Sequence, residues 1–294
     1  MNPMLKEFME EYKSKLENEL DKLVLNLNAP KVLKDAMAYS LQAGGKRIRP
    51  MLLFATISSF GENPKKGMAA AAALEMIHTY SLIHDDLPSM DDDDLRRGKP
   101  TNHKVFGEAY AILAGDAMLT NAFQVIARAD EYDASLKVKL IDWLAEAAGP
   151  EGMVGGQTAD IEGEKKSLSL EELENIHRNK TGRLLTYGVL AGALIAGADE
   201  QQLHWLEDYA THIGIAFQIQ DDILDIEGTE EALGKPIGSD VANEKSTYPA
   251  LLTLEGAKTK LNEHIEKAEE ALGKLDMDMP LLKQLASLIA SRQQ

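Results

Sequence analysis

Residues Ala69–Asp86, which read AAAAALEMIHTYSLIHDD, decide the fold of this chain of 294 residues. The apolar positions fall on more than one side of a helical wheel, and a helix of that kind belongs inside a bundle. Asn63 before Pro64 is a good helix start, so the pattern predicts a helix of about six to seven turns from Pro64 to Leu87. The stretch therefore predicts a buried central helix that ends in a pair of aspartates.

Further helices are predicted on both sides of this stretch. Ser169–Glu172 has the spacing of a capping box and opens a helix that reaches about Ala196. Asp199 starts another long helix that ends near Gly228. Gly44–Gly45 are expected to be C-cap glycines of the helix before them. Four more segments have a helical period, at about 107–130, 133–148, 247–272 and 278–292.

No stretch alternates convincingly with a period of two residues, so the sequence predicts essentially no sheet. The long loops, at about 88–104, 149–167 and 228–247, lack the composition of flexible linkers. The predicted fold is therefore all-α: a single large helical bundle around a central apolar cleft, formed by one domain over residues 1–294.

Composition narrows the range of functions. A formal net charge of −17 argues against a nucleic-acid partner, because binding phosphates needs a basic surface. An anionic substrate would need metal ions and a few placed Lys and Arg to invert the charge locally. The absence of Cys excludes disulfides, thiolate metal sites and Cys nucleophiles. No uncharged apolar run of about 18 residues is present, so we expect no membrane span and a cytoplasmic location.

Carboxylates gather immediately after the central helix. His84–Gly98 contains six Asp and two consecutive Arg. Carboxylate oxygens are ligands of Mg²⁺ and guanidinium groups suit diphosphate oxygens, although a solvated acidic loop has the same composition. Pro88 predicts that the helix ends or bulges before it, so that later aspartates return from an irregular turn. Spacing leaves Asp91 and Asp92 both open as the partner of Asp85.

A second acidic cluster, Asp221–Asp225, follows much later in the chain. Asp221 and Asp225 are four residues apart, so on a helix their carboxylates share one face within reach of one cation. Two like charges so placed cost stability, and apolar neighbours such as Phe217 and Ile223 make a solvated face hard to sustain. The pattern favours a bound cation over a solvated face.

Together these motifs resemble the paired aspartate-rich motifs of trans-isoprenyl diphosphate synthases, and are closest in pattern to the bacterial, farnesyl-producing type. The matching segments are Gly44–Pro50, Asp85–Asp91, Leu95–Gly98, Lys180–Gly182, Phe217–Gln220, Asp221–Asp225 and Gly234–Pro236. They occur in the family's order and cover most of the chain. The resemblance implies the isoprenoid synthase type of helical bundle.

The resemblance also implies a reaction and its residues. An allylic diphosphate ionises, the double bond of isopentenyl diphosphate attacks, and a proton is lost to the released diphosphate, so no protein base is required. Mg²⁺, with several ions per site and Mn²⁺ as a possible substitute, is implied at Asp85, Asp91 and Asp221, with Asp225 in support. The resemblance implies that the allylic diphosphate binds at Arg96, Lys180, Lys235 and Lys245, and that isopentenyl diphosphate binds at Lys46, Arg49, His78 and Arg97. It also implies that the allylic cation is stabilised by the side-chain oxygens of Thr181 and Gln218.

Several of these residues have a simpler interpretation when taken alone. His78 among apolar neighbours has the pattern of a satisfied core histidine. Lys180–Thr181 inside a helix, and Gln218, carry little signal without the family motifs. Packing and support are the roles expected of His84, Gly155–Gln157 and Asp160.

Product length depends on what blocks the growing chain beneath Asp85. Tyr80 and Ser81 are the candidates, and the helical wheel places Ser81 nearer to the Asp85 face, so spacing alone does not choose between them. The resemblance selects Tyr80 and implies farnesyl diphosphate, C15, made from isopentenyl diphosphate with dimethylallyl and then geranyl diphosphate.

Four alternatives were weighed. A geranylgeranyl or geranyl diphosphate synthase of the same family differs only in product. A terpene cyclase binds one diphosphate, which leaves Lys46 and Arg49 without a purpose. A non-catalytic partner subunit of a synthase would be expected to have degraded acidic clusters, and both are intact. A plain cation-binding helical bundle leaves Arg96–Arg97 unexplained. The family also suggests a homodimer that forms through apolar helix faces.

Overall fold

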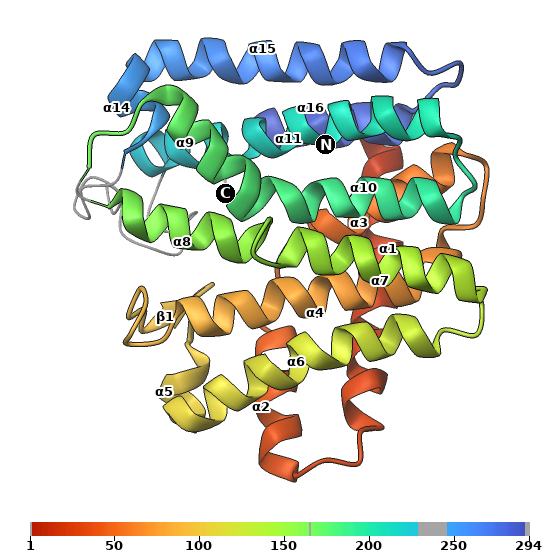
Figure 1. The fold of residues 1–294 in the computed structure, drawn as a ribbon, viewed down its shortest axis with the longest axis vertical. Helices are drawn as coiled ribbons and strands as arrows, with labels where there is room; N and C mark the ends of the chain where they lie inside the picture. Colours follow the sequence, from red (N-terminus) through yellow and green to blue (C-terminus); the bar gives the residue numbers. More distant parts are fainter. Residues whose placement is uncertain (1, 165, 229–245, 292–294) are drawn as a thin grey trace.

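The computed structural model describes residues 2–164, 166–228 and 246–291, and these are almost entirely helical (Figure 1). The helices are α1 Pro3–Leu25, α2 Lys31–Leu41, α3 Ile48–Ser59, α4 Met68–Asp85, α5 Asn102–Phe106, α6 Glu108–Arg128, α7 Ala134–Ala148, α8 Met153–Gly163, α9 Leu170–His177, α10 Arg183–Ile195, α11 Glu200–Glu227, α14 Tyr248–Leu252, α15 Leu254–Gly273 and α16 Pro280–Ser291. Two short segments are a 3₁₀ turn, η1 Pro64–Gly67, and a π-helical turn, η2 Arg178–Gly182. The strands β1 Leu95–Arg96 and β2 Lys99–Pro100 form one small antiparallel pair. The predicted all-α fold is confirmed.

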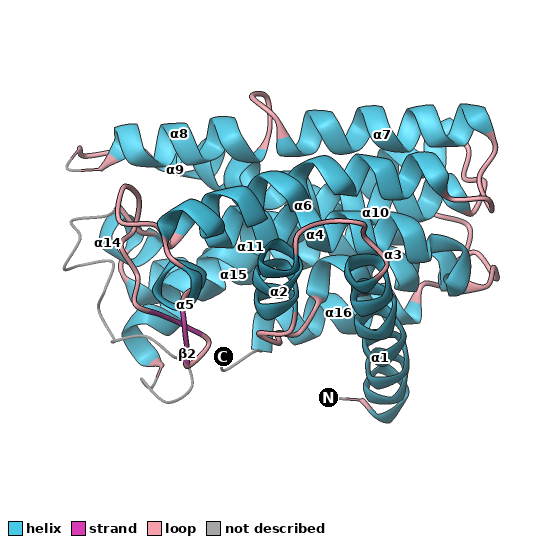
Figure 2. Cartoon of the chain, turned by 90° about the horizontal axis from the view of Figure 1, so that it is seen from below, coloured by secondary structure: helices cyan, strands magenta, loops and turns pink. Residues whose placement is uncertain are grey.

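Helix α4 lies at the centre of the hydrophobic core. Its alanines Ala70–Ala73 are completely buried, and their small side chains allow neighbouring helices to approach closely. Helix α4 packs against α6 and α3, and α3 packs in turn against α10. The axes of the long helices α4, α6, α10 and α15 are roughly parallel, with α4 antiparallel to the other three, whereas α2 crosses them (Figures 1 and 2). The predicted buried central helix is therefore present.

The end of α4 agrees with the prediction made from Pro88. The helix stops at Asp85, and Asp86 is its C-cap. The backbone N–H of Asp91 donates to the carbonyl oxygen of Asp85 at 2.9 Å. This bond folds the chain back on itself, so Asp91 returns to the end of the helix.

Two local predictions were wrong. Helix α2 ends at Leu41 with Gln42 as its C-cap, and Gly44–Gly45 instead form the connection to α3 with φ values of 88° and 121°. The helix predicted from Ser169 starts there with its capping box, but η2 interrupts it. An added Cβ at Gly214 of α11 would lie 2.8 Å from the Cα of Gly182, so the backbones of η2 and α11 are in close contact at this point.

Of the described helices, only α6 is long and apolar enough to cross a membrane by length and composition, with a mean hydropathy of 1.2. It carries Asp116 near its middle and packs against α4 in the bundle. The two helices meet closely, because a Cβ added at Gly115 would lie 2.2 Å from the His84 ring. Packing in the bundle accounts for the apolar residues on the buried side of α6, whereas others, such as Leu113, stay exposed.

Candidate active site

A cavity of about 410 Å³ opens beside the C-terminal end of α4. Seven of the residues singled out in the sequence line it: Arg49, His78, Tyr80, Ser81, Asp85, Lys180 and Thr181. The rest of its lining is largely apolar and includes Leu82, Met90, Met153, Val154 and Ile161. The cavity therefore combines an apolar wall with charged groups, which suits a substrate with an apolar chain and an anionic head.

The carboxylate of Asp85 is half-buried in this cavity. Its pKa is raised to about 6, chiefly by burial and also by the neighbouring charge of Asp91, while Lys180 opposes the shift. Asp85 is thus a carboxylate that lacks full hydration and has a second carboxylate and an ammonium group close by. A divalent cation would stabilise its charged form.

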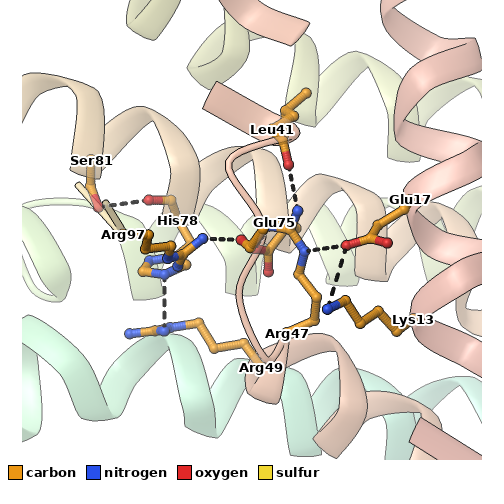
Figure 3. A network of polar contacts seen from close by, with 10 residues as sticks. Lys13, Glu17, Leu41, Arg47, Arg49, Glu75, His78, Ser81 and Arg97 are labelled. Carbon is orange, nitrogen blue, oxygen red and sulfur yellow. Dashed lines mark hydrogen bonds and ion pairs between the residues drawn. The ribbon is translucent and has the colours of Figure 1, made fainter. Parts of the chain in front are cut away.

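His78 and Arg49 form one side of the site. The Nη1 atom of Arg49 lies 3.3 Å from Nε2 of His78. The pKa of His78 is well below its usual value because the ring is buried and because the guanidinium groups of Arg49 and Arg97 lie nearby. The ring is therefore neutral near pH 7, so Nε2 accepts a hydrogen bond from Arg49 (Figure 3).

Two further predicted cations belong to the same side. The Nη1 group of Arg97 donates to the carbonyl oxygen of Gly44, which attaches the β1–β2 hairpin to the loop between α2 and α3. A Cβ added at Gly45 would lie 2.6 Å from that guanidinium nitrogen and would displace it, and the φ of 121° at Gly45 disfavours any other residue. Lys46 is exposed on the same loop. The structure thus brings Arg49, His78 and Arg97 together, with Lys46 on the adjoining loop.

Arg96 is engaged by carboxylates. Its Nε atom lies 2.6 Å from Oδ1 of Asp86, and its Nη2 atom lies 3.3 Å from Oδ2 of Asp93. Asp86 is buried, and burial raises its pKa although the bond from Arg96 lowers it. Asp86 therefore positions Arg96 at the edge of the first acidic cluster.

Lys180 connects this cavity to a second, smaller one. It lies in η2, and its Nζ atom is 2.6 Å from Oδ2 of Asp160 on α8. A second cavity of about 100 Å³ is lined by Lys180, Asp160, Gln218 and Asp222, among others. Because Lys180 lines both cavities, the end of α4 and the acidic segment of α11 face adjoining spaces.

The second acidic cluster lies on α11 as predicted. Asp225 is buried and Asp221 is half-buried. Between them, Oδ2 of Asp222 accepts a hydrogen bond from the backbone N–H of Tyr248 at 2.9 Å. Asp222 thereby ties α14 to α11, while Asp221 and Asp225 share the next face of the helix.

Within the described part of the chain, no three carboxylate or imidazole groups converge into a preformed metal site. This arrangement fits Mg²⁺, which is commonly held by one or two carboxylates together with substrate phosphates. Asp85 and Asp91 supply such a pair. Lys235 and Lys245 lie outside the described residues.

Tyr80 and Ser81 both line the cavity, so its lining does not choose between them as the floor. The ring of Tyr80 is buried and stands edge-on to that of His84, with centroids 5.7 Å apart. The ring nitrogen Nε2 of His84 lies 3.1 Å from the carbonyl oxygen of Ile112 on α6. The supporting role predicted for His84 agrees with this contact.

Sequence reasoning missed the buried ion pair of Arg47 and Glu75, whose nearest atoms are 2.6 Å apart. One signal was available: Glu75 is the only charged residue within the run Ala69–Ile77. A lone carboxylate in a buried helix needs a cation, but nothing local identifies which one. Support by Asp160 was expected, although its partner Lys180 was not named.

Comparison with known proteins gives a consistent result. The sequence matches the polyprenyl synthetase family over residues 30–279. It is 59% identical to farnesyl diphosphate synthase of Geobacillus stearothermophilus, over 98% of each chain. It is 53% identical to farnesyl diphosphate synthase of Bacillus subtilis, over 99% of each chain.

A solved structure has the same fold. The geranyltransferase of Helicobacter pylori, complexed with magnesium and isoprenyl diphosphate, superposes with a TM-score of 0.85 at 32% identity, covering 98% of this chain and 97% of that one. The resemblance noted in the motifs is therefore confirmed over the whole length of the chain. This chain belongs to the polyprenyl synthetase family.

Proposed function

We propose that this chain is a short-chain trans-prenyltransferase that condenses isopentenyl diphosphate with dimethylallyl and then geranyl diphosphate to give farnesyl diphosphate. The observation that carries the proposal is the cavity at the end of α4. Its apolar wall is bordered by Asp85 and Lys180 and by the Arg49–His78 pair, which all line the same cavity. Two separate polar groups beside one apolar space suit two diphosphate substrates whose chains must meet.

Isopentenyl diphosphate binds at Arg49, His78 and Arg97, with Lys46 reaching in from the loop. The guanidinium forks of the two Arg offer paired donors to diphosphate oxygens. His78 is neutral and partnered by Arg49, so it orients the guanidinium without adding a charge. The local excess of cations offsets the negative charge of the chain as a whole.

The allylic diphosphate binds across the two acidic clusters. Asp85, Asp91 and Asp221 hold Mg²⁺, with Asp225 in support, and Mn²⁺ is a possible substitute. When bound, the cations supply Lewis-acid neutralisation of the leaving diphosphate. The raised pKa of Asp85 supports this role, because a poorly hydrated carboxylate gains more from a cation than a solvated one does.

Cationic side chains complete the allylic half. Lys180 lies beside Asp85 and is held by Asp160. Arg96 is held by Asp86 at the other edge, and keeps further N–H donors for the diphosphate. Lys235 and Lys245 have the same role by family pattern.

The allylic carbon is placed by uncharged oxygens. Thr181 is buried and lines the first cavity, and Gln218 lines the second. Their side-chain oxygens stabilise positive charge as it develops on the substrate carbon. Tyr80 closes the cavity beneath Asp85, with Ser81 beside it, and limits the product to C15.

The enzyme acts as a cytoplasmic homodimer. Helix α6 presents exposed apolar residues, including Tyr110, Ile112 and Leu113, which are 43–52% exposed. Leu113 stands opposite the buried face of α6, and Tyr110 and Ile112 flank that face on its two sides. A second copy of the chain would bury them, which supports an interface along α6.

One incubation tests the function. Purified protein is given isopentenyl and dimethylallyl diphosphates with and without Mg²⁺, and the alcohols obtained after dephosphorylation are sized. We expect a C15 alcohol that requires the metal. A C20 or C10 alcohol would make this a geranylgeranyl or geranyl synthase, and no condensation product would favour a non-catalytic partner subunit.

A further inference from the structure

The loop between α2 and α3 has an unusual backbone. Gly44, Gly45 and Arg47 all have φ in the left-handed region, at 88°, 121° and 55°. The glycines adopt this conformation freely, but Arg47 has a Cβ and does so at a cost in free energy. A conformation of this kind persists only where the surroundings hold it in place.

The side chain of Arg47 supplies that restraint. It is 1% exposed, and its Nη1 atom lies 2.6 Å from Oε1 of Glu75, which is itself buried in α4. Its Nη2 group donates to the carbonyl oxygen of Leu41, and its Nε atom lies 3.5 Å from the carboxylate of Glu17 on α1 (Figure 3). Three elements, α1, α2 and α4, therefore converge on one guanidinium.

Arg47 is not placed to bind a diphosphate. Its guanidinium is buried and directed at protein oxygens, whereas Lys46 next to it is exposed. The ion pair of Glu75 in the described structure is with Arg47; the Glu75 charge also acts on Arg97, where it raises the pKa against burial, and the Oε2 atom of Glu75 is buried without a hydrogen-bond partner. The pair is therefore internal, and each member depends on the other.

The loop has a second attachment, at its solvent side. Arg97 donates to the carbonyl oxygen of Gly44, and Nζ of Lys99 lies 3.3 Å from the carbonyl oxygen of Gln42. Arg97 also binds isopentenyl diphosphate in the proposed function, so its contacts change when a diphosphate binds. The attachment through Arg47 is internal and does not compete with substrate.

We propose that Arg47 is a positioning residue for isopentenyl diphosphate: its buried pair with Glu75 fixes the loop so that Lys46 and Arg49 face the site. This inference rests on the proposed function. Glu75 lies three residues before His78 on α4, so both side chains leave the same face of that helix. Holding the loop on Glu75 therefore sets the register in which Arg49 meets His78.

Three variants test the inference: Arg47→Met, Arg47→Lys, and the double variant Arg47→Met with Glu75→Met. We expect Arg47→Met to raise KM for isopentenyl diphosphate about tenfold, because the ligand must then order the loop itself. We expect kcat, and KM for dimethylallyl diphosphate, to change less than about twofold. Arg47→Lys keeps the charge but loses the planar guanidinium, so its KM for isopentenyl diphosphate should lie between those of Arg47→Met and the wild type.

The double variant separates positioning from stability. Arg47→Met alone leaves the buried carboxylate of Glu75 without its cation and lowers Tm. Removing both charges in the double variant is expected to restore much of the lost Tm. The positioning role predicts that Tm recovers in the double variant while KM for isopentenyl diphosphate stays high. A KM that recovers together with Tm would overturn the inference. Tyr209→Phe, which loses a buried hydrogen bond to Leu282 far from the loop, is the matched control for stability alone.

Hydrogen–deuterium exchange of the substrate-free proteins gives a readout that does not need activity. The amides of residues 42–48 should exchange faster in Arg47→Met and in the double variant than in wild type or Tyr209→Phe. Unchanged exchange would overturn the inference whatever the substrate. A wild-type protein that forms no condensation product would instead reject the proposed function, and the exchange result would still be readable.

Discussion

At the scale of single residues, the chemistry of the site depends on how burial alters charge. Asp85 is half-buried, and its pKa is raised to about 6 from the usual 3.8. In the metal-free protein the charged form still predominates at neutral pH, but it is less stable than it would be in water. A cation bound beside Asp85 would stabilise the charged form and so offset this effect of burial.

Asp85→Asn tests that cost through stability. The pKa of Asp85 is higher in the folded protein than in the unfolded chain, so its favourable contribution is present below about pH 4 and lost as pH rises through about 6. We expect the variant to stabilise the metal-free protein at pH 8 by about 1 to 2 kcal/mol and to change little at pH 4. Thermal melts at both pH values in the presence of a chelator measure this. An equal Tm shift at the two pH values would contradict it.

Asp85→Asn should lower enzymatic activity, although it stabilises the metal-free protein. Loss of the Asp85 carboxylate is expected to lower kcat/KM on the order of 10²- to 10³-fold even with saturating Mg²⁺. In the wild type, protonation of Asp85 should weaken Mg²⁺ binding as pH falls below about 6. Mg²⁺ titrations between pH 5 and pH 8 check this, and an affinity independent of pH would count against Asp85 as a ligand.

Tyr80→Ala is the second prediction at this scale. Removing the ring deepens the cavity beneath Asp85, so the growing chain gains room and we expect products longer than C15. Ser81→Ala is the matched control, because Ser81 lines the same cavity but presents a small side chain. Chromatography of the dephosphorylated products distinguishes the outcomes. An unchanged C15 distribution in Tyr80→Ala would reject Tyr80 as the floor.

At the scale of elements, η2 is the feature that tertiary contacts impose. It lies against α8, where a Cβ added at Gly156 would be 2.1 Å from the backbone nitrogen of Lys180. The π-helical turn thus holds Lys180 and Thr181 where two backbones are in close contact. Irregular turns of this kind are frequent at functional sites.

Gly156→Ala therefore tests the placement of η2. An alanine is normally favourable inside a helix by about 0.5 to 1 kcal/mol, but here the methyl group must displace the backbone at Lys180. We expect a fall in kcat of at least about tenfold, because catalytic groups are sensitive to displacements of about 1 Å. Gly163→Ala, in the same helix, meets only the side chains of Leu168 and Ile176 and should leave kcat near wild type. Equal kcat values for the two variants would contradict the role of η2.

The start of a helix could be predicted where the capping residues that mark it lie within one turn of each other in the sequence. The capping box at Ser169 and the N-cap at Asp199 both form as predicted, because each depends on residues within one turn. The π-helical turn was not predictable, since it depends on glycines of α8 and α11 that are remote in sequence. Local pattern determines where a helix begins, whereas packing determines whether it continues unbroken.

The site was predictable to the same extent. The acidic clusters and the cavity-lining residues follow from motifs that are contiguous in sequence. The pairs Arg47–Glu75, which is buried, and Lys180–Asp160, which is half-buried, join residues 28 and 20 positions apart, so no local pattern reveals them. Sequence therefore supplied the residues proposed to bind substrate, and structure identified the residues that hold Lys180 and the loop before α3.

At the scale of the whole molecule, one face of α6 has no partner among the described residues of the chain. Leu113→Lys places a charge among its exposed apolar residues, so we expect the proposed dimer to dissociate, with Kd raised by at least about 100-fold. Val138→Lys is the matched control, because Val138 is an apolar residue that is 67% exposed on a different helix, α7. Sedimentation velocity over a range of concentrations measures both variants. A wild type that is monomeric at all concentrations would reject the dimer.

The whole-molecule account requires that Asp85 on α4 and Asp221 on α11 act on one diphosphate. The direct test is a crystal structure of the protein grown with Mg²⁺ and a non-reactive thiolodiphosphate analogue of dimethylallyl diphosphate. We predict metal ions bound to Asp85, Asp91 and Asp221, all in contact with the same diphosphate, and the allylic chain in the cavity above Tyr80. A diphosphate bound away from both clusters, or metal at only one of them, would contradict the account.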